Sequence, residues 1–530
     1  MEALLDYLGA QAEAANPGVN PDQAEDDSFS QRASIHTMVF LAGLPNTGPG
    51  ALHLPQGLES ENDMEGDGEE MLEPQTDFYK ELGLRAADAG MVVDLCVASE
   101  HSHTDLASLH FLSTMSGGAV FLYGTLEEST LPQDIYRRLR RPRCTRGILR
   151  LRTSVEFSVV RAYGRLFPDQ QYDNMYHLLS CDQHDTFAFD FEFASTQGFS
   201  QPYPPVLQLA FQYTVVLPKG GSDGDGEPVE YVLSRRLRLH TLSMKLSTKP
   251  KEVYESANAE VIVTLLMHKI VRASKEEGLA EARLLLLDWL VILMAHYNEH
   301  YGTTAFGEAA ASASLDVTFA KCEALQTVPR LVFAMLQSPL LRPVKAAGRI
   351  APARFDAASG VGQGGQGLEG ASVASADYRI YLQCLYAYLE PAALLRAIYP
   401  VLSSYTTPDQ EAFPRHSLSR AALVTSGSPI FLLDAFTCIV VYYAPTAPTT
   451  LPFPPPQSSP LRQAINALKA DRVITPRLQF LRGGVDPVSP FEDRLIEEQD
   501  VGINGVAPGL GFVGFLDHVT SEVRSFMQTS

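Results

Sequence analysis

Several features that mark whole classes of protein are missing from this 530-residue sequence. The six cysteines contain no CxxC pair, which excludes a zinc ribbon, and at this length they argue against a disulfide framework. Residues 1–8 lack a basic segment and a long apolar core, so they do not predict a signal peptide. The longest apolar stretches, 284–295 and 430–444, are each interrupted by an aspartate and are too short for a transmembrane helix. We therefore expect a cytosolic protein without a membrane span.

Positive charge is scarce as well. The chain has 41 lysines and arginines against 62 aspartates and glutamates, and its formal net charge is −21. Because phosphate binding needs clustered basic residues, this balance argues against a general nucleic-acid binder. Eight of the 62 acidic residues lie in segment 57–73, which we interpret as a solvated loop. The content of 45% hydrophobic and 19% charged residues is typical of a globular protein, and the length predicts two to four domains.

The first part of the chain, residues 1–135, alternates predicted strands with predicted helices. Short apolar runs predict strands at 35–41, 91–97 and 119–123, and helical spacing predicts helices at 77–84 and 106–115. Strands and helices in this order are typical of an α/β sheet, and we expect residues 1–135 to form the end of one.

The rest of the chain changes its periodicity twice. Residues 136–248 alternate polar and apolar positions without intervening helices, which predicts a β-sandwich or barrel. Residues 249–405 have helical spacing, apart from a Gly/Ala/Ser-rich segment at 353–376 that we interpret as a flexible insertion. Residues 406–530 predict a small α+β domain with a hairpin and a closing helix. The expected fold class is multidomain α+β.

Three motifs resemble those of enzymes, but their positions argue against catalysis. Residues 220–224 match GxSxG, yet they lie in a Gly/Asp loop between strands rather than at a strand-to-helix turn. Segments 362–367 and 509–514 match GxGxxG; the first has no strand before it, and the second lies too close to residue 530 for a dinucleotide fold. We found no other spacing of His, Asp or Glu with ligand meaning. The sequence therefore predicts no enzyme, no metal site and no cofactor.

A run of arginines stands out in this acidic chain. Eight arginines fall within 137–152: Arg137, Arg138, Arg140, Arg141, Arg143, Arg146, Arg150 and Arg152. On a strand, Arg150 and Arg152 point to the same face, and Arg236 and Arg238 repeat this spacing. We expect the two pairs to form one wall that binds acidic peptides or phospholipid headgroups. The alternative is a solvated sheet face whose arginines pair with local acids.

Several segments, in order along the chain, resemble the Sec24 family, the cargo-adaptor subunit of the COPII inner coat. They include the turn GLPNTGPG, the helix start PQTDFYK, the segments VDL and TDLASL, the strands RLRTS and RRLRLHTL, and the late helix FVGFLDHV. The resemblance implies a partial von Willebrand-like α/β trunk (1–135), a β-sandwich or barrel (136–248), an all-helical domain (249–405) and a gelsolin-like α+β domain (406–530).

The resemblance also implies a function in intracellular protein transport. A protein of this family would select cargo for vesicles moving from endoplasmic reticulum to Golgi, binding acidic export signals on the cytosolic tails of transmembrane cargo. It would pair with a Sec23-type sister subunit and lie peripherally on the membrane at endoplasmic reticulum exit sites. Arg150 and Arg152 match the family's basic strand, whereas Arg236 and Arg238 are inferred from strand geometry alone.

The sequence departs from the family in two ways. The chain begins at a late trunk helix, and the zinc module of the family is absent, so no zinc is expected. Three alternatives stay open: a Sec23-type subunit, which shares the layout but lacks the TDFYK and SDLASL wording; a gelsolin-like actin- or phosphoinositide-binding protein; and a nucleic-acid-binding module that uses the arginine run.

Overall fold

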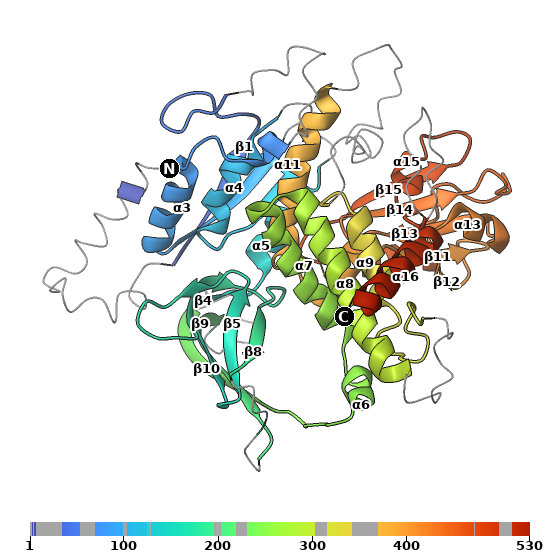
Figure 1. Ribbon diagram of the computed structural model, residues 1–530. Helices are drawn as coiled ribbons and strands as arrows, with labels where there is room; N and C mark the ends of the chain where they lie inside the picture. Colours follow the sequence, from blue (N-terminus) through green and yellow to red (C-terminus); the bar gives the residue numbers. More distant parts are fainter. Residues whose placement is uncertain are drawn as a thin grey trace, which may run out of the picture. The chain divides into compact units, whose positions relative to one another are not determined.

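In the computed structural model the chain folds into two compact units. Figure 1 labels their main helices and strands. Unit 1 comprises Met1–Leu126, Ile135–Leu246 and Glu369–Leu389, and unit 2 comprises Glu127–Asp134, Ser247–Leu368 and Glu390–Ser530. The structure describes residues 3, 5, 6, 34–53, 69–98, 103–124, 126, 129–194, 199, 203–218, 231–302, 315–341, 369–470, 472–497 and 511–529. Apart from the short 3-10 helix Glu69–Leu72 and Glu73, the predicted acidic loop 57–73 lies outside these residues.

Unit 1 begins with a three-stranded parallel sheet, as the sequence predicts. Its strands, in spatial order, are β1 (Ile35–Leu41), β2 (Met91–Ala98) and β3 (Val120–Tyr123). The central strand β2 is buried along nearly its whole length, which is typical of a parallel strand covered on both faces. Helices α3 (Phe78–Asp88) and α4 (Leu106–Thr114) pack on one face of the sheet. The α/β part of the predicted fold is confirmed.

Helix α11 (Glu369–Tyr386) joins this part of unit 1 from far along the chain. Its buried Asp377 accepts hydrogen bonds from the backbone amides of Thr104 and Leu106, both at 2.8 Å, at the start of α4. The helix begins inside the predicted flexible insertion 353–376, so the prediction is wrong from Glu369 onward. The start of the helix is rich in alanine and serine, which give no apolar periodicity, so the sequence pattern did not predict it. Alanine is nevertheless the strongest helix former. Residues 353–368 lie outside the described part.

The β-rich part of unit 1 is a sandwich of two antiparallel sheets. The larger has the order β10-β9-β4-β7-β6, and the smaller pairs β5 with β8. The bounds are β4 (Cys144–Thr153), β5 (Phe157–Tyr163), β6 (Phe167–Pro168), β7 (Met175–Cys181), β8 (Ala188–Phe193), β9 (Val206–Pro218) and β10 (Tyr231–Ser243). Leu149 and Leu178 of the larger sheet form a core with Phe189 of the smaller one. The sequence patterns predicted neither β7 nor helix α5 (Leu131–Arg140), which comes just before β4.

Pairing of β4 with β7 brings two cysteines together that are far apart in the sequence. Cys144 and Cys181 are directly opposite each other, and their Sγ atoms lie 2.8 Å apart with both thiols free. The hydrogen bond between them lowers the pKa of Cys144 and raises that of Cys181. Spacing along the sequence cannot reveal such a pair, because only the strand register creates it.

Unit 2 contains a group of packed helices. They are α6 (Pro250–Glu255), α7 (Ala259–Glu276), α8 (Leu279–Gly302), α9 (Val328–Gln337), α12 (Pro391–Ile398) and α16 (Phe512–Thr529). The side chain of Asn258 caps α7 by accepting from the amides of Glu260 and Val261. Phe512 and Phe515 of α16 contact Phe333 of α9, so the C-terminal helix packs with these helices. No helix in the described part of the chain is long and apolar enough to cross a membrane.

The second part of unit 2 is a five-stranded mixed sheet of order β12-β11-β13-β14-β15. The strands are β11 (Val401–Tyr405), β12 (Phe413–Arg415), β13 (Ile430–Asp434), β14 (Cys438–Tyr443) and β15 (Arg477–Arg482), with helices α13 (Arg420–Ser426), α14 (Pro460–Ala470) and α15 (Ser489–Glu492). The predicted hairpin is confirmed as β13 and β14. Separate apolar clusters lie on the two faces, around Phe491 on one and Leu461 of α14 on the other. The sheet already includes β11, before the predicted boundary at 406.

Candidate functional site

Two of the four predicted site arginines project from one face of β4. Arg150 and Arg152 are exposed, whereas the alternate residues Leu149 and Leu151 are 2% and 6% exposed. This is the two-residue period of a strand with one buried face. The prediction that Arg150 and Arg152 face outward from one strand is confirmed.

The neighbouring strand β9 fixes which residues share that outer face. Arg150 lies opposite Ala210 of β9, and Arg152 lies opposite Gln208. Directly paired residues point to the same side of a sheet, so the even-numbered residues of this part of β9 belong to the outer face. The guanidinium of Arg152 donates to the side-chain oxygen of Gln208 at 3.3 Å, in agreement with this assignment.

The other predicted pair lies on the opposite face. On the edge strand β10, Arg236 is paired with Tyr213 of β9, and Arg238 is paired with Phe211. These odd-numbered β9 residues face the inside of the sandwich, where Phe211 joins the core. The expectation that all four arginines form one wall is therefore wrong. The two Arg-Leu-Arg motifs look identical in sequence, but the pairing register with the strand between them sets their faces.

A different arginine, Arg235, shares the outer face with Arg150 and Arg152. It is paired with Thr214 of β9, and its guanidinium lies against the side-chain amide of Gln212. We call the surface formed by Arg150, Arg152, Arg235, Gln208 and Gln212 the basic outer face. Within the described part of the chain, none of its three arginines forms an ion pair with a carboxylate. This weakens the alternative in which they only neutralise local acids.

In contrast to Arg150 and Arg152, Arg138 of the same arginine-rich segment is buried. Its side chain is 6% exposed and makes a two-pronged contact with Asp94 of β2: Nε donates to Oδ2 at 2.6 Å and Nη2 to Oδ1 at 2.8 Å. Its third nitrogen, Nη1, lies 3.5 Å from Asp182, just after β7. Arg138 thus links the parallel sheet to the sandwich within unit 1.

The environment of Asp94 keeps this pair charged. Burial by itself would raise the pKa of Asp94, but the charges and hydrogen bonds of Arg138 and His36 outweigh burial and hold that pKa well below its usual value. Arg143 lies at the edge of the same group, with Nη2 4.0 Å from Asp94. Burial and repulsion by Arg138 lower the pKa of Arg143 to about 10. The group is a structural link within unit 1.

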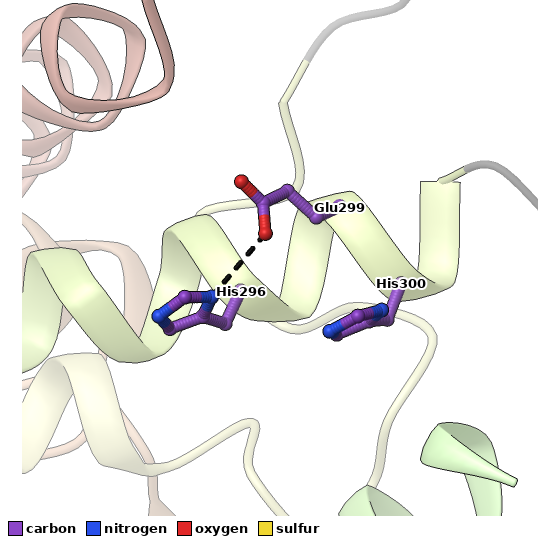
Figure 2. Close-up of side chains that lie close together, drawn as sticks. All are labelled: His296, Glu299 and His300. Atoms are coloured by element: carbon purple, nitrogen blue, oxygen red, sulfur yellow. Dashed lines mark hydrogen bonds and ion pairs between the residues drawn. The ribbon is translucent and has the colours of Figure 1, made fainter. Parts of the chain in front are cut away.

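A group of potential metal ligands lies on α8 in unit 2. His296, Glu299 and His300 have ligand atoms within 4.8 Å of one another (Figure 2). The sequence-based prediction that no spacing of His, Asp or Glu has ligand meaning missed these three residues. The spacing i, i+3, i+4 within the predicted helical region 249–405 was the available signal, since it makes His296 a neighbour of both Glu299 and His300 on the helix surface.

Two family models match the chain: the Sec23/Sec24 trunk domain at residues 30–141 and the Sec23/Sec24 helical domain at residues 258–349. The chain is 44% identical over 537 residues to "Protein transport protein SEC23 D" of Arabidopsis thaliana, a match that covers 100% of this chain and 66% of the relative. It is 27% identical over 266 residues to "Protein transport protein Sec24A" of Mus musculus, which covers 49% of this chain and 22% of the relative. The predicted trunk and helical domains are confirmed.

A solved structure shows the same fold over nearly all of the chain. The human COPII-coat protein Sec24c is similar with a TM-score of 0.71 and 19% identity, covering 95% of this chain and 63% of that chain. The Sec24-specific interpretation is not supported, because the match over the whole chain is to a relative named SEC23. Short motifs such as TDFYK favoured Sec24, but a few residues discriminate less well than identity along 530 positions.

Proposed function

Because the chain belongs to the Sec23/Sec24 family, we propose that it is a COPII coat component in protein transport, of the Sec23 type rather than the Sec24 type. The observation that carries this proposal is the 44% identity over the whole chain to a SEC23 relative, against 22–27% over parts of the chain for the Sec24 relatives. The chain spans 66% of that SEC23 relative's length. Its proposed role therefore concerns the part of a coat subunit that these residues form.

The proposed role is mechanical rather than catalytic. A coat subunit acts by binding a partner subunit and lying on a membrane surface, and neither task needs a reacting group. For a Sec23-type chain the partner is a Sec24-type subunit. We propose peripheral contact with the endoplasmic reticulum membrane at exit sites, and transport towards the Golgi.

Co-expression tests the subunit type. The tagged chain is co-expressed with either a Sec24-type or a Sec23-type subunit from one species, and the complexes are purified and measured by light scattering. We expect a one-to-one complex with the Sec24-type subunit only. Pairing with the Sec23-type subunit alone would restore the cargo-adaptor interpretation, and binding to neither would contradict the coat proposal for this length of chain.

For the basic outer face we propose a ligand of acidic peptide type. Arg150 and Arg152 are two positions apart on a strand, so their side chains emerge about 7 Å apart. An extended peptide with two acids separated by one residue has the same spacing. Guanidinium groups bind carboxylates through paired hydrogen bonds, and neither arginine is engaged with an acid in the described part of the chain.

The sheet supplies a matched control for this site. Arg150→Glu with Arg152→Glu reverses two charges on the outer face, and Arg236→Glu with Arg238→Glu reverses two on the inner-facing side of β10. Titration of a labelled peptide containing Asp-x-Glu should show at least about tenfold weaker binding for the first variant, since each charge-assisted bond contributes about 1.5–3 kcal/mol when partly desolvated. The second variant should bind like wild type.

Two results would count against the site. Equal loss in both variants would indicate a long-range effect of net charge rather than recognition at the outer face. No loss in either would remove the site altogether. Binding of anionic vesicles instead of the peptide, lost only in the first variant, would assign the face to lipid headgroups and contradict the peptide proposal.

A further inference from the structure

The last turns of α8 gather three side chains that bind transition metals in other proteins. His296, Glu299 and His300 occupy positions i, i+3 and i+4 of the helix Leu279–Gly302, so they are neighbours on its surface. The ligand atoms of all three lie within 4.8 Å of one another. Figure 2 shows the two imidazoles one turn apart on α8, with the carboxylate of Glu299 joined to His296.

We propose that His296, Glu299 and His300 form a binding site for a divalent transition metal of the Zn²⁺ class. Imidazole nitrogens favour zinc and its neighbours in the first transition row, whereas Mg²⁺ and Ca²⁺ select sites made of oxygens alone. Two histidines and one carboxylate are also a common ligand set for zinc. Its residues belong to unit 2, whereas the basic outer face belongs to unit 1, and the proposal does not depend on the coat function.

The distances suit a metal after small side-chain rotations. Zinc lies about 2.0–2.1 Å from imidazole nitrogen and about 2.0–2.2 Å from carboxylate oxygen, so tetrahedral ligand atoms are about 3.4 Å apart. The side chain of His296 is 53% exposed and that of Glu299 is 37% exposed, so both have room to rotate. The required movement is on the order of 1 Å, which side-chain rotation supplies without moving the helix.

Glu299 has a defined place in this arrangement. Its Oε2 atom lies 3.2 Å from Nδ1 of His296, so these two atoms already have about the separation of two ligands on one ion. In Figure 2 the Nε2 atom of His296 lies on the side of the ring away from Glu299 and His300, which leaves Nδ1 as the ligand atom of this histidine. Removal of the Glu299 carboxylate therefore removes one of three ligands and weakens binding.

The position of the site indicates what a bound metal does. Two ligands one turn apart are held together when both bind the same ion, which stabilises the helical turn between them. His296 also contacts the ring of Phe526 on α16, with ring centroids 6.4 Å apart. A metal on His296 would therefore stabilise both the end of α8 and this contact with α16. Three protein ligands leave at least one coordination position for water or for an outside ligand.

Metal titration of the untagged full chain tests the proposal. Isothermal calorimetry with ZnCl₂ and absorption spectroscopy with Co²⁺ are carried out on wild type, on His296→Asn with His300→Asn, and on Glu299→Gln. We expect a site with a stoichiometry of one per chain in wild type, loss of that site in the double histidine variant, and about 10–100-fold weaker binding in Glu299→Gln. Zinc should raise the melting temperature of wild type, raise that of Glu299→Gln by less, and leave that of the double histidine variant unchanged, because a ligand stabilises the state that binds it.

The control is His240→Asn, which removes an exposed histidine from β10 in unit 1. It should keep the wild-type site. Melting curves in EDTA should be the same for all four proteins, which separates loss of metal binding from loss of folding. Equal zinc binding by wild type and the double variant would overturn the proposal, and so would the absence of binding by wild type at 100-fold excess of metal over protein.

Discussion

Arg138 and Arg150 come from one arginine-rich segment, yet the fold gives them opposite environments. Arg138 is 6% exposed and donates two hydrogen bonds to Asp94. Arg150 is exposed, and its Cζ atom lies 5.9 Å from the ring centroid of Tyr172. The difference shows that a run of like charges is not one functional unit. Each arginine is assigned by what lies opposite it in the folded chain.

The energetic consequences differ in the same way. A buried ion pair contributes little compared with a well-packed apolar pair, but removal of one partner leaves an uncompensated charge in the interior. An exposed arginine has water as an alternative partner, so its loss costs little stability. Buried arginines of this segment should therefore be needed for folding, and exposed ones should be free to bind ligands.

The largest effect is expected from Arg138→Ala. This change leaves the carboxylate of Asp94 buried without its main partner, and we expect it to lower the free energy of unfolding by about 3–5 kcal/mol. Urea denaturation followed by circular dichroism measures it. Arg140→Ala on the same helix is the control, because Arg140 is exposed and should change stability by less than about 1 kcal/mol. Similar decreases in the free energy of unfolding for both variants would show that the buried arginine is no more important for stability than the exposed one.

A buried histidine, His268, extends the comparison of buried and exposed side chains, because its protonation makes the free energy of unfolding depend on pH. Burial in α7 lowers the pKa of His268 to about 4, below the usual value of 6.5. Its folded pKa is lower than its unfolded pKa, so its contribution is fully present above about pH 6.5 and is lost as the pH falls towards 4. The difference corresponds to about 3 kcal/mol.

Unfolding free energies measured at intervals between pH 7 and pH 4 test this. The wild type should lose more stability over that range than His268→Leu, in which no proton can bind at this position. Parallel pH curves for the two proteins would show that His268 does not contribute.

The smallest effect is expected at the basic outer face. Arg150→Glu with Arg152→Glu should change the unfolding free energy by at most about 0.5 kcal/mol, since neither side chain is paired with an acid in the described part of the chain. The measurement is the same urea titration, carried out beside the peptide-binding assay. A decrease in the unfolding free energy above about 2 kcal/mol would show that these arginines stabilise the fold, as Arg138 is expected to do.

Periodicity predicted many of the elements well. The apolar run at 35–41 and the alternation within 136–248 need only local information, because backbone geometry repeats every two residues in a strand. Elements with mixed composition were missed. In β7, His177 and Ser180 break the apolar pattern, and α11 begins among glycine, alanine and serine residues whose apolar face is too sparse to recognise.

The sequence by itself determined the α+β class, the positions of several strands and helices, the outward direction of Arg150 and Arg152, and a resemblance to one family of coat proteins. Each of these depends on residues that are close together in the chain. Only the tertiary structure decided that Arg236 faces away from Arg150, that Arg138 finds Asp94 and that Cys144 finds Cys181. These outcomes depend on strand register and on packing between distant segments. A shift of one residue in register would reverse every face, and local patterns carry no information about it.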